Sequence, residues 1–171
     1  NRFMREINCD AIKLEGGRRS AAVVKGIVEA GIPVCGHIGL TPQISSNMGG
    51  FKVQGKSMDA VNELLADAKA IEEAGAFMIM VEGVPVSVCK YIRDNINIPI
   101  IGIGAGPECE IQGLIFQDML GFTDWVPKFA KKYANIGPQM LDAFNTYHKE
   151  VTEGQFPTPE YSYNTKVEGL E

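Results

Sequence analysis

The sequence lacks most of the features that zinc-binding, nucleic-acid-binding and membrane proteins require. Its 171 residues contain four cysteines and two histidines. No two cysteines form a C-x-x-C pair, which argues against a zinc site. Basic residues number 16 against 21 acidic ones, so nothing favours binding to nucleic acid or to an anionic membrane surface. No apolar run approaches the roughly 18 residues of a membrane span, and no signal peptide is visible. We therefore expect a cytoplasmic protein with reduced thiols.

Short apolar segments recur along the chain and predict buried strands, because each is bounded by glycine, proline or asparagine. Their nearly continuous hydrophobicity is typical of parallel strands that are covered on both faces. These segments are residues 11–16, 32–37, 76–83, 98–106 and 113–118. Strands that alternate with helices indicate an α/β fold with a parallel sheet.

Helical patterns lie between most of these segments and also follow the last one. The expected helices are residues 18–30, 57–74, 85–95, 127–135 and 138–153. Ser57 is placed to cap one of them, and Gly31 and Gly75 to end two. The chain begins in a helix-like stretch with no leading strand. We expect residues 1–153 to belong to one domain and residues 154–171, which are polar with glycine and proline, to form an extended tail.

Five parallel strands fit either an open doubly wound sheet or part of an eight-stranded (β/α)8 barrel. The ends of the predicted strands favour the barrel. Lys13 and Glu15, then His37, then Glu82 follow successive strands, and a glycine cluster follows the next at residues 102–106. In barrels the chemistry lies at the carboxyl ends of the strands and in the loops that follow them.

Lys13 and Glu15 are two residues apart on a predicted strand, so both side chains face the same side of the sheet. A lysine and a carboxylate in a buried strand are costly unless they are paired or used. Two interpretations remain open. The pair is a structural ion pair, or the lysine binds an anionic substrate and the carboxylate lies near a hard cation.

Glu82 and His37 are the other candidates. Glu82 ends the apolar run FMIMV, where a carboxylate suits a general base or acid, although it could also lie exposed just past the strand. Three interpretations of His37 stay open. It donates a hydrogen bond to substrate, it binds a metal ion, or it is a core histidine whose hydrogen bonds are made within the protein. The glycines around it, Gly36 and Gly39, are interpreted as clearance for substrate. His148 lies in a polar helical segment and is expected on the surface.

Two further segments bear on function. The sequence GIGAG at 102–106 lacks the G-x-G-x-x-G spacing of a dinucleotide site, so it is interpreted as a strand end that leaves room for substrate. The loop over residues 40–57 is long for a strand-to-helix connection. It is either a lid over the site or a mobile surface insertion, and the lid is favoured.

Several of these stretches resemble the ketopantoate hydroxymethyltransferase family. The matching runs are IKLEGG, IPVCGHIGLTPQ, GGFKVQGKS, LLADAKAIEEAGAFMIMVEGVP, IPIIGIGAG, DMLG and PKFAKKY, in the family's order. The resemblance implies a (β/α)8 barrel of the phosphoenolpyruvate-mutase and isocitrate-lyase type. In that barrel this chain would supply strands four to eight and the C-terminal helices.

The resemblance also implies a reaction. A hydroxymethyl group passes from 5,10-methylenetetrahydrofolate to 3-methyl-2-oxobutanoate and gives 2-dehydropantoate, in a Mg²⁺-dependent enzyme of pantothenate biosynthesis. By resemblance, Glu82 is the catalytic base, Lys13 and His37 bind the keto acid, and Glu15 belongs to the magnesium site. The family implies a homo-oligomer, decameric by resemblance.

Residues 109–118 depart from the family pattern. Ile111 stands where the family has glycine, and Gly113 takes an apolar strand position, so we expect a weakened last strand. Two alternatives stay open. One is another metal-dependent enzyme that makes or breaks C–C bonds of α-keto acids. The other is a fragment or subunit that is catalytically incomplete.

Overall fold

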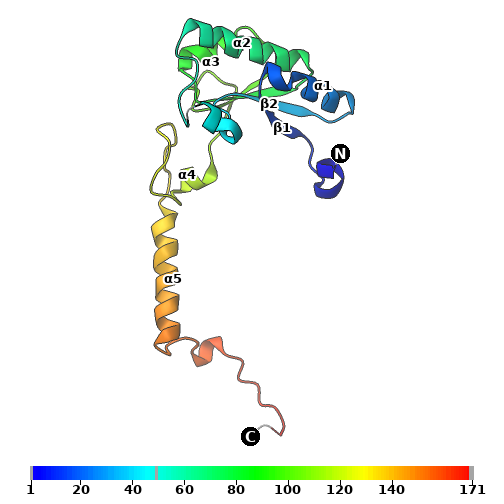
Figure 1. The fold of residues 1–171 in the computed structure, drawn as a ribbon. Helices are drawn as coiled ribbons and strands as arrows, with labels where there is room; N and C mark the ends of the chain where they lie inside the picture. The colour runs from blue at the N-terminus through cyan, green and yellow to red at the C-terminus, as the bar shows by residue number, and fades with distance from the viewer. Residues whose placement is uncertain (1, 49, 170–171) are drawn as a thin grey trace. The chain divides into compact units, whose positions relative to one another are not determined.

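The structure is a computed structural model that describes residues 2–48 and 50–169 (Figure 1). The chain divides into two compact units, Asn1–Leu114 and Ile115–Glu171, which are described separately below. The expectation of one domain over residues 1–153 with a tail after it stays a prediction.

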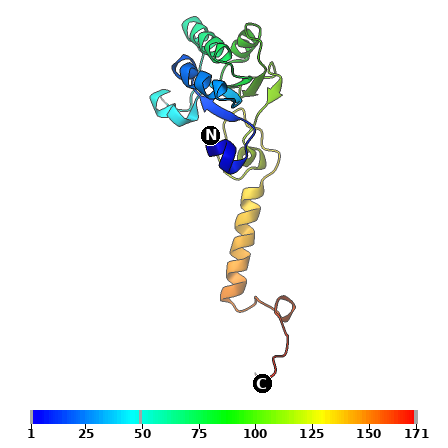
Figure 2. The same cartoon turned by 90° about the vertical axis from the view of Figure 1, so that its right-hand side faces the viewer.

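The first unit alternates strands and helices (Figure 2). Its strands are β1 (Ile12–Glu15), β2 (Val34–Gly39), β3 (Met78–Glu82), β4 (Ile100–Ile103) and β5 (Ile111–Gln112). Its α-helices are α1 (Ala21–Glu29), α2 (Met58–Glu73) and α3 (Val86–Arg93). Shorter helical turns are η1 (Phe3–Ile7), η2 (Arg18–Ser20) and η3 (Pro42–Met48). The second unit contains α4 (Phe116–Leu120), α5 (Ile136–Thr152) and η4 (Pro159–Tyr161).

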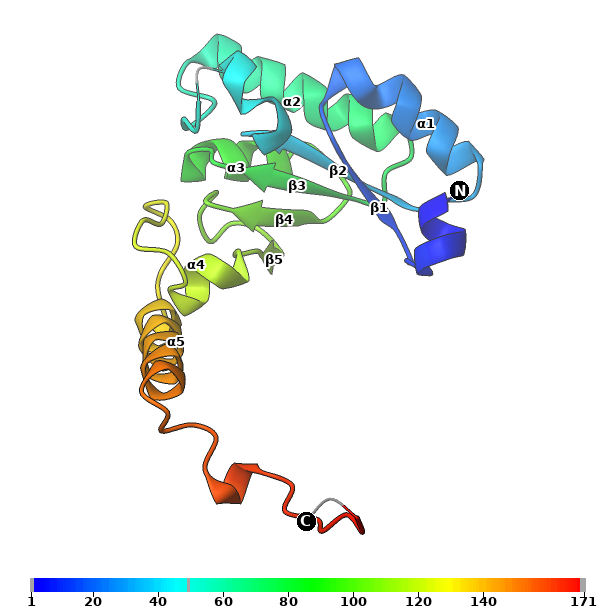
Figure 3. The same ribbon diagram turned by 60° about the horizontal axis from the view of Figure 1, so that its bottom comes forward.

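The described strands form one five-stranded sheet in the order β1-β2-β3-β4-β5, and each neighbouring pair is parallel. A doubly wound sheet reverses its strand order at a switch point and carries helices on both faces. Here the order never reverses, and α1, α2 and α3 lie on one face of the sheet (Figure 3). This is the arrangement of a barrel wall, so the predicted fold class is confirmed.

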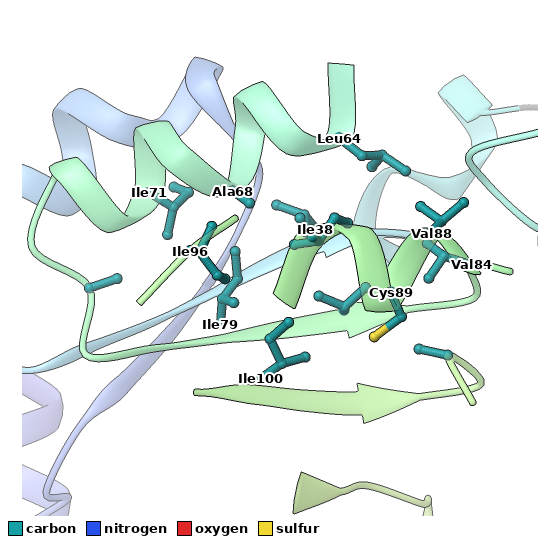
Figure 4. Packing of buried hydrophobic residues seen from close by; sticks show 14 of the residues in the cluster. Ile38, Leu64, Ala68, Ile71, Ile79, Val84, Val88, Cys89, Ile96 and Ile100 are labelled. Atoms are coloured by element: carbon teal, nitrogen blue, oxygen red, sulfur yellow. The ribbon is translucent and has the colours of Figure 1, made fainter. Parts of the chain in front are cut away.

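The face under the helices is the hydrophobic core of the first unit (Figure 4). Side chains alternate along a strand, and the register aligns Leu14, Gly36 and Ile79 across three strands on this face. Its fully or almost fully buried members include Val34, Ile38, Ile79, Val81 and Ile100 from strands, and Ala68, Ile71, Cys89 and Ile92 from helices.

The predicted helix boundaries hold because their capping groups are present. The Ser57 hydroxyl accepts a hydrogen bond from the Ala60 amide at 3.3 Å. Gly31 and Gly75 adopt positive φ angles of 81° and 93° just after α1 and α2. Each donates its amide back to the preceding helix, and the residue that follows each glycine does the same, which completes a Schellman motif at both ends.

The sequence prediction is wrong over residues 113–118 and 127–135. The last strand is only Ile111–Gln112, and α4 begins at Phe116, because the run GLIF can form a strand or a helix and periodicity does not distinguish them. Residues 127–135 form no helix. Instead Tyr133 donates its amide to the Met119 carbonyl at 2.8 Å, which folds this stretch against α4. The helix predicted over 138–153 is confirmed as α5.

Gly36 allows α2 to approach the sheet closely. A Cβ atom built on Gly36 would lie 2.3 Å from Cγ2 of Ile71, a buried residue of α2. The expectation that Gly36 leaves room for substrate is therefore wrong, since the space beside it belongs to the core.

We predict that Gly36→Ala lowers the free energy of unfolding by about 1–3 kcal/mol, because the extra methyl group overpacks the contact with Ile71. The matched control is Gly26→Ala in α1, where nothing lies within 4 Å of the new Cβ. That change should be neutral or raise stability by roughly 0.5–1 kcal/mol. Urea unfolding of both variants measures the difference, and equal effects would contradict the packing argument.

Candidate active site

The face of the sheet that points away from the helices carries the predicted site residues. The register aligns Lys13 with Cys35, Glu15 with His37, His37 with Met80, and Gly39 with Glu82. Lys13, Glu15, Cys35, His37, Met78, Met80 and Glu82 therefore share this face. The β3 residues on it are half-buried, whereas Ile79 and Val81 on the helix side are fully buried. The predicted site residues and the hydrophobic core thus lie on opposite faces of the same strands.

His37 lies between two carboxylates at the carboxyl ends of three adjacent strands. Its Nε2 is 3.2 Å from Oε2 of Glu82, and its Nδ1 is 3.6 Å from Oε1 of Glu15. The imidazole is fully buried, and the Glu15 and Glu82 side chains are 8% and 12% exposed. Neither ring nitrogen has a hydrogen bond of good geometry among the described residues. We call Glu15, His37 and Glu82 the carboxylate–histidine cluster.

This cluster can hold and pass protons. A neutral imidazole has one N–H donor and one acceptor nitrogen, whereas an ionised carboxylate only accepts hydrogen bonds. A neutral imidazole can therefore donate to only one of the two carboxylates that face its ring nitrogens. The arrangement is therefore suited to general acid–base chemistry at the mouth of the sheet.

The second oxygen of Glu15 is held by the loop that follows β2. The backbone amide of Gln43, at the start of η3, donates a hydrogen bond to Glu15 Oε2 at 3.1 Å. Sequence reasoning missed this contact, because a backbone amide leaves no residue-type signal. Part of the loop over residues 40–57 thus orients a site carboxylate. The lid role stays a prediction, and residue 49 of this loop lies outside the described residues.

Backbone hydrogen bonds fix the strand ends around the cluster. The Leu40 amide donates to the Glu82 carbonyl at 2.8 Å, and the Gly83 amide donates to the Ile103 carbonyl at 2.9 Å. Gly39 has a φ of 85°, and a Cβ atom there would lie 2.3 Å from the Glu82 carbonyl oxygen. The expectation that Gly39 clears space for substrate is wrong, because this glycine permits the close approach of β2 to β3.

Lys13 lies on the same face as the cluster but outside it. Its side chain is exposed, and it forms no ion pair with any residue that the structure describes. The structural ion pair between Lys13 and Glu15 that the sequence left open is therefore absent. Burial raises the pKa of the Cys35 thiol, and the nearby Lys13 ammonium partly opposes that rise. Lys13 thus supplies a positive charge to this face.

The described residues do not form a complete magnesium site. No group of three histidine, cysteine, aspartate or glutamate side chains in the described part of the chain is arranged to hold a metal ion. Mg²⁺ prefers about six oxygen ligands. Glu15 offers one carboxylate, and His37 occupies the space between it and Glu82.

A cavity of about 750 Å³ opens on the other side of the strand ends. Arg18, Ile38, Glu63 and Asp67 are among the residues that line it, and the carboxylate–histidine cluster is not. Arg18 is paired with Glu63 and, at 3.1 Å, with Asp67, so its charge is already compensated. This cavity is therefore separate from the carboxylate–histidine cluster.

The glycine cluster at the carboxyl end of β4 accommodates protein side chains. A Cβ atom on Gly102 would lie 2.1 Å from the Cys109 sulfur, and one on Gly106 would lie 2.5 Å from a methyl carbon of Val86. The expectation that these glycines leave room for substrate is wrong at both positions.

In the described residues no helix is both long and apolar enough to cross a membrane.

A protein-family model described as ketopantoate hydroxymethyltransferase matches residues 1–159. The chain belongs to the ketopantoate hydroxymethyltransferase family. Among curated members of this family, 3-methyl-2-oxobutanoate hydroxymethyltransferase of Heliobacterium modesticaldum is 53% identical over 99% of this chain and 63% of the relative. The protein of the same name from Clostridium acetobutylicum is 54% identical over 95% of this chain and 59% of the relative.

The chain thus spans about three fifths of the length of these two curated relatives. The corresponding protein of Syntrophobacter fumaroxidans gives the same picture, with 49% identity over 99% of this chain and 62% of the relative. The strand-end residues Lys13, Glu15, His37 and Glu82 lie within the residues that the family model matches.

We predict that His37→Leu changes the free energy of unfolding by no more than about 1.5 kcal/mol, because leucine fills a similar volume and the imidazole has no good hydrogen bond to lose. The matched control is Ile38→Ala, one residue further and on the core face, which should cost about 2–5 kcal/mol. Chemical denaturation measures both. A loss at His37 as large as that at Ile38 would assign the histidine to structure.

Proposed function

We propose that the full-length protein is a 3-methyl-2-oxobutanoate hydroxymethyltransferase that uses 5,10-methylenetetrahydrofolate as the one-carbon donor. Membership of the family and the names of the relatives support the activity. The observation that carries the proposal is the carboxylate–histidine cluster at the carboxyl ends of β1, β2 and β3. Parallel barrels place their catalytic groups at these strand ends.

The chemical step begins with removal of the proton from C3 of the keto acid. Glu82 is the proposed base, since its carboxylate is largely buried and faces His37, which can share the proton it takes up. The carbon nucleophile then forms a new C–C bond to the methylene carbon of the folate, and a C–N bond of the folate breaks. Water supplies the hydroxyl group as the second C–N bond of that methylene carbon breaks, the two folate nitrogens take up the C3 proton and the remaining proton of the water, and tetrahydrofolate and 2-dehydropantoate leave.

Lys13 and His37 are proposed to bind the keto acid. The exposed ammonium of Lys13 lies on the cluster's face of the sheet and can pair with the substrate carboxylate. His37 can donate to a substrate oxygen, and in doing so it gains the hydrogen-bond partner that it lacks here. Binding of an anionic substrate thus satisfies two groups that the structure leaves without good partners among the described residues.

The dependence on Mg²⁺ remains a proposal by resemblance. Glu15 would be the residue of this chain that contacts the ion, directly or through water, and further oxygen ligands would have to come from outside the described residues. We also propose a cytoplasmic homo-oligomer, decameric as the family resemblance implies.

We predict that Glu82→Gln lowers the rate of exchange of the C3 proton of 3-methyl-2-oxobutanoate with solvent by roughly 10²–10⁴-fold, because the amide cannot act as a base. Keto-acid binding should change little. Exchange into D₂O by the full-length protein with Mg²⁺, followed by NMR, measures the rate. Glu73→Gln at the exposed end of α2 is the control, and it should exchange at the unaltered rate. Unaltered exchange in Glu82→Gln would remove Glu82 from the chemical step.

We predict that Lys13→Met weakens binding of the keto acid by about 10- to 100-fold, which corresponds to the loss of one charged hydrogen bond of roughly 1.5–3 kcal/mol. Lys25→Met is the matched control, because Lys25 pairs with Glu29 on the surface of α1. Isothermal titration with the keto acid measures both affinities. If the Lys13 and Lys25 variants bind alike, the substrate carboxylate is bound elsewhere.

A further inference from the structure

Two cysteines that the proposed reaction does not use lie side by side in the first unit. The sulfur of Cys89, in α3, is 3.2 Å from the sulfur of Cys109, in the loop between β4 and β5. Cys89 is fully buried in the core (Figure 4), and Cys109 is half-buried. The two cysteines are 20 residues apart in sequence, and one thiol is buried whereas the other is partly exposed to solvent.

Several contacts hold the loop that carries Cys109 against α3. The Arg93 guanidinium donates to the Glu108 carboxylate at 2.8 Å and to the Glu108 carbonyl at 3.0 Å. Gly106 lies against Val86, where a Cβ atom would not fit. The Ile100 amide donates to Glu110 Oε2 at 2.8 Å, which ties the other side of Cys109 to β4. The approach of the two sulfurs is therefore built into the packing on both sides.

Gly102 provides the space for the Cys109 side chain. A Cβ atom on this residue would lie 2.1 Å from the Cys109 sulfur and 3.0 Å from its Cβ. The other two cysteines are placed differently. The Cys9 sulfur contacts the Met4 sulfur at 3.5 Å, and the Cys35 thiol lies 3.4 Å from the Gly36 carbonyl oxygen. Neither is close to a second thiol among the described residues.

We propose that Cys89 and Cys109 form a reversible disulfide, with a small-molecule disulfide such as oxidised glutathione as the oxidant. The sulfurs must approach from 3.2 Å to about 2.05 Å, which requires a small shift of loop 104–110, the segment that carries Cys109. This loop follows β4, whose Ile103 carbonyl accepts the hydrogen bond of Gly83, the residue after Glu82. The bond would therefore fix a segment next to the candidate active site.

The exchange proceeds in two balanced steps. The more accessible Cys109 thiolate attacks one sulfur of the oxidant, forms a mixed disulfide and releases one glutathione thiolate. Cys89 then gives up its proton to solvent or to that thiolate and attacks the Cys109 sulfur, which releases the second glutathione. The two protein thiols lose two hydrogens in total, and the oxidant gains both.

The environment of the two thiols sets this order of attack. Burial, together with the hydrogen bond and charge of the neighbouring Cys109, raises the pKa of Cys89 to about 12. Cys89 is therefore a poor first nucleophile at neutral pH. A mixed disulfide on Cys109 removes the neighbouring thiol's contribution and places an electrophilic sulfur beside Cys89.

The test uses the full-length protein in buffers with increasing ratios of oxidised to reduced glutathione, followed by alkylation of free thiols and peptide mass spectrometry. We expect a Cys89–Cys109 cross-link, two hydrogens lighter than the two thiols, that dithiothreitol reverses. The oxidised protein should also unfold at a temperature several degrees higher than the reduced one. Fully alkylated Cys89 and Cys109 at the most oxidising ratio, or glutathione that remains on Cys109, would overturn the proposal.

Variants separate the roles of the two thiols. In Cys89→Ala, which keeps the buried site apolar, glutathione should accumulate on Cys109, and oxidation should no longer raise the unfolding temperature. In Cys109→Ser, Cys89 should stay unmodified. Cys9→Ser is the matched control and should leave the yield of the cross-link unchanged. A cross-link to Cys9 or Cys35 in any of these proteins would also contradict the assignment.

Discussion

The alternation of side chains along β2 is the constraint on which the rest of the first unit depends. Every residue of this strand is buried. Val34, Gly36 and Ile38 face the helices, whereas Cys35 and His37 face the opposite side of the sheet. The contact between Gly36 and Ile71 fixes the height of α2 above the strand, and the same backbone then places His37 between Glu15 and Glu82. The packing of the core therefore sets the geometry of the candidate site.

This coupling explains how a buried histidine can persist without good hydrogen bonds. Leaving a buried polar group without a partner costs roughly 1–3 kcal/mol. The apolar packing of Val34, Ile38, Ile79 and Ile100, each almost fully buried, is large enough to support it. Unsatisfied polar groups inside an otherwise consistent fold are expected at functional sites. The imidazole without good hydrogen bonds thus supports the proposal that His37 binds the keto acid.

The sequence predicted which residues lie on each face of the parallel strands, but it did not predict the contacts that loops and glycines make around them. Period-two spacing placed Lys13 and Glu15 on one face, and strand ends grouped them with His37 and Glu82, because these patterns follow from backbone geometry alone. Contacts made by the backbone, such as the Gln43 amide on Glu15, carry no residue-type signal. Glycines misled the prediction for a related reason. A missing side chain shows that something approaches closely, but only the tertiary structure identifies it as Ile71, the Glu82 carbonyl or Cys109.

The last strand, β5, forms few backbone hydrogen bonds with β4, and side chains supply further contacts. β5 pairs with β4 through only Ile111 and Gln112, and both residues are exposed. Such a short edge strand contributes little pairing of its own. Three further hydrogen bonds hold this segment in place. The Glu110 carboxylate accepts from the Ile100 amide of β4, and the Gly113 amide donates to the Gly102 carbonyl. The Gln112 side-chain amide donates to the Gly106 carbonyl at 3.0 Å. Individual side chains, rather than strand propensity, therefore hold β5 to the rest of the sheet. Cys109 lies in the middle of these contacts, so any covalent change at its sulfur acts directly on the edge of the sheet.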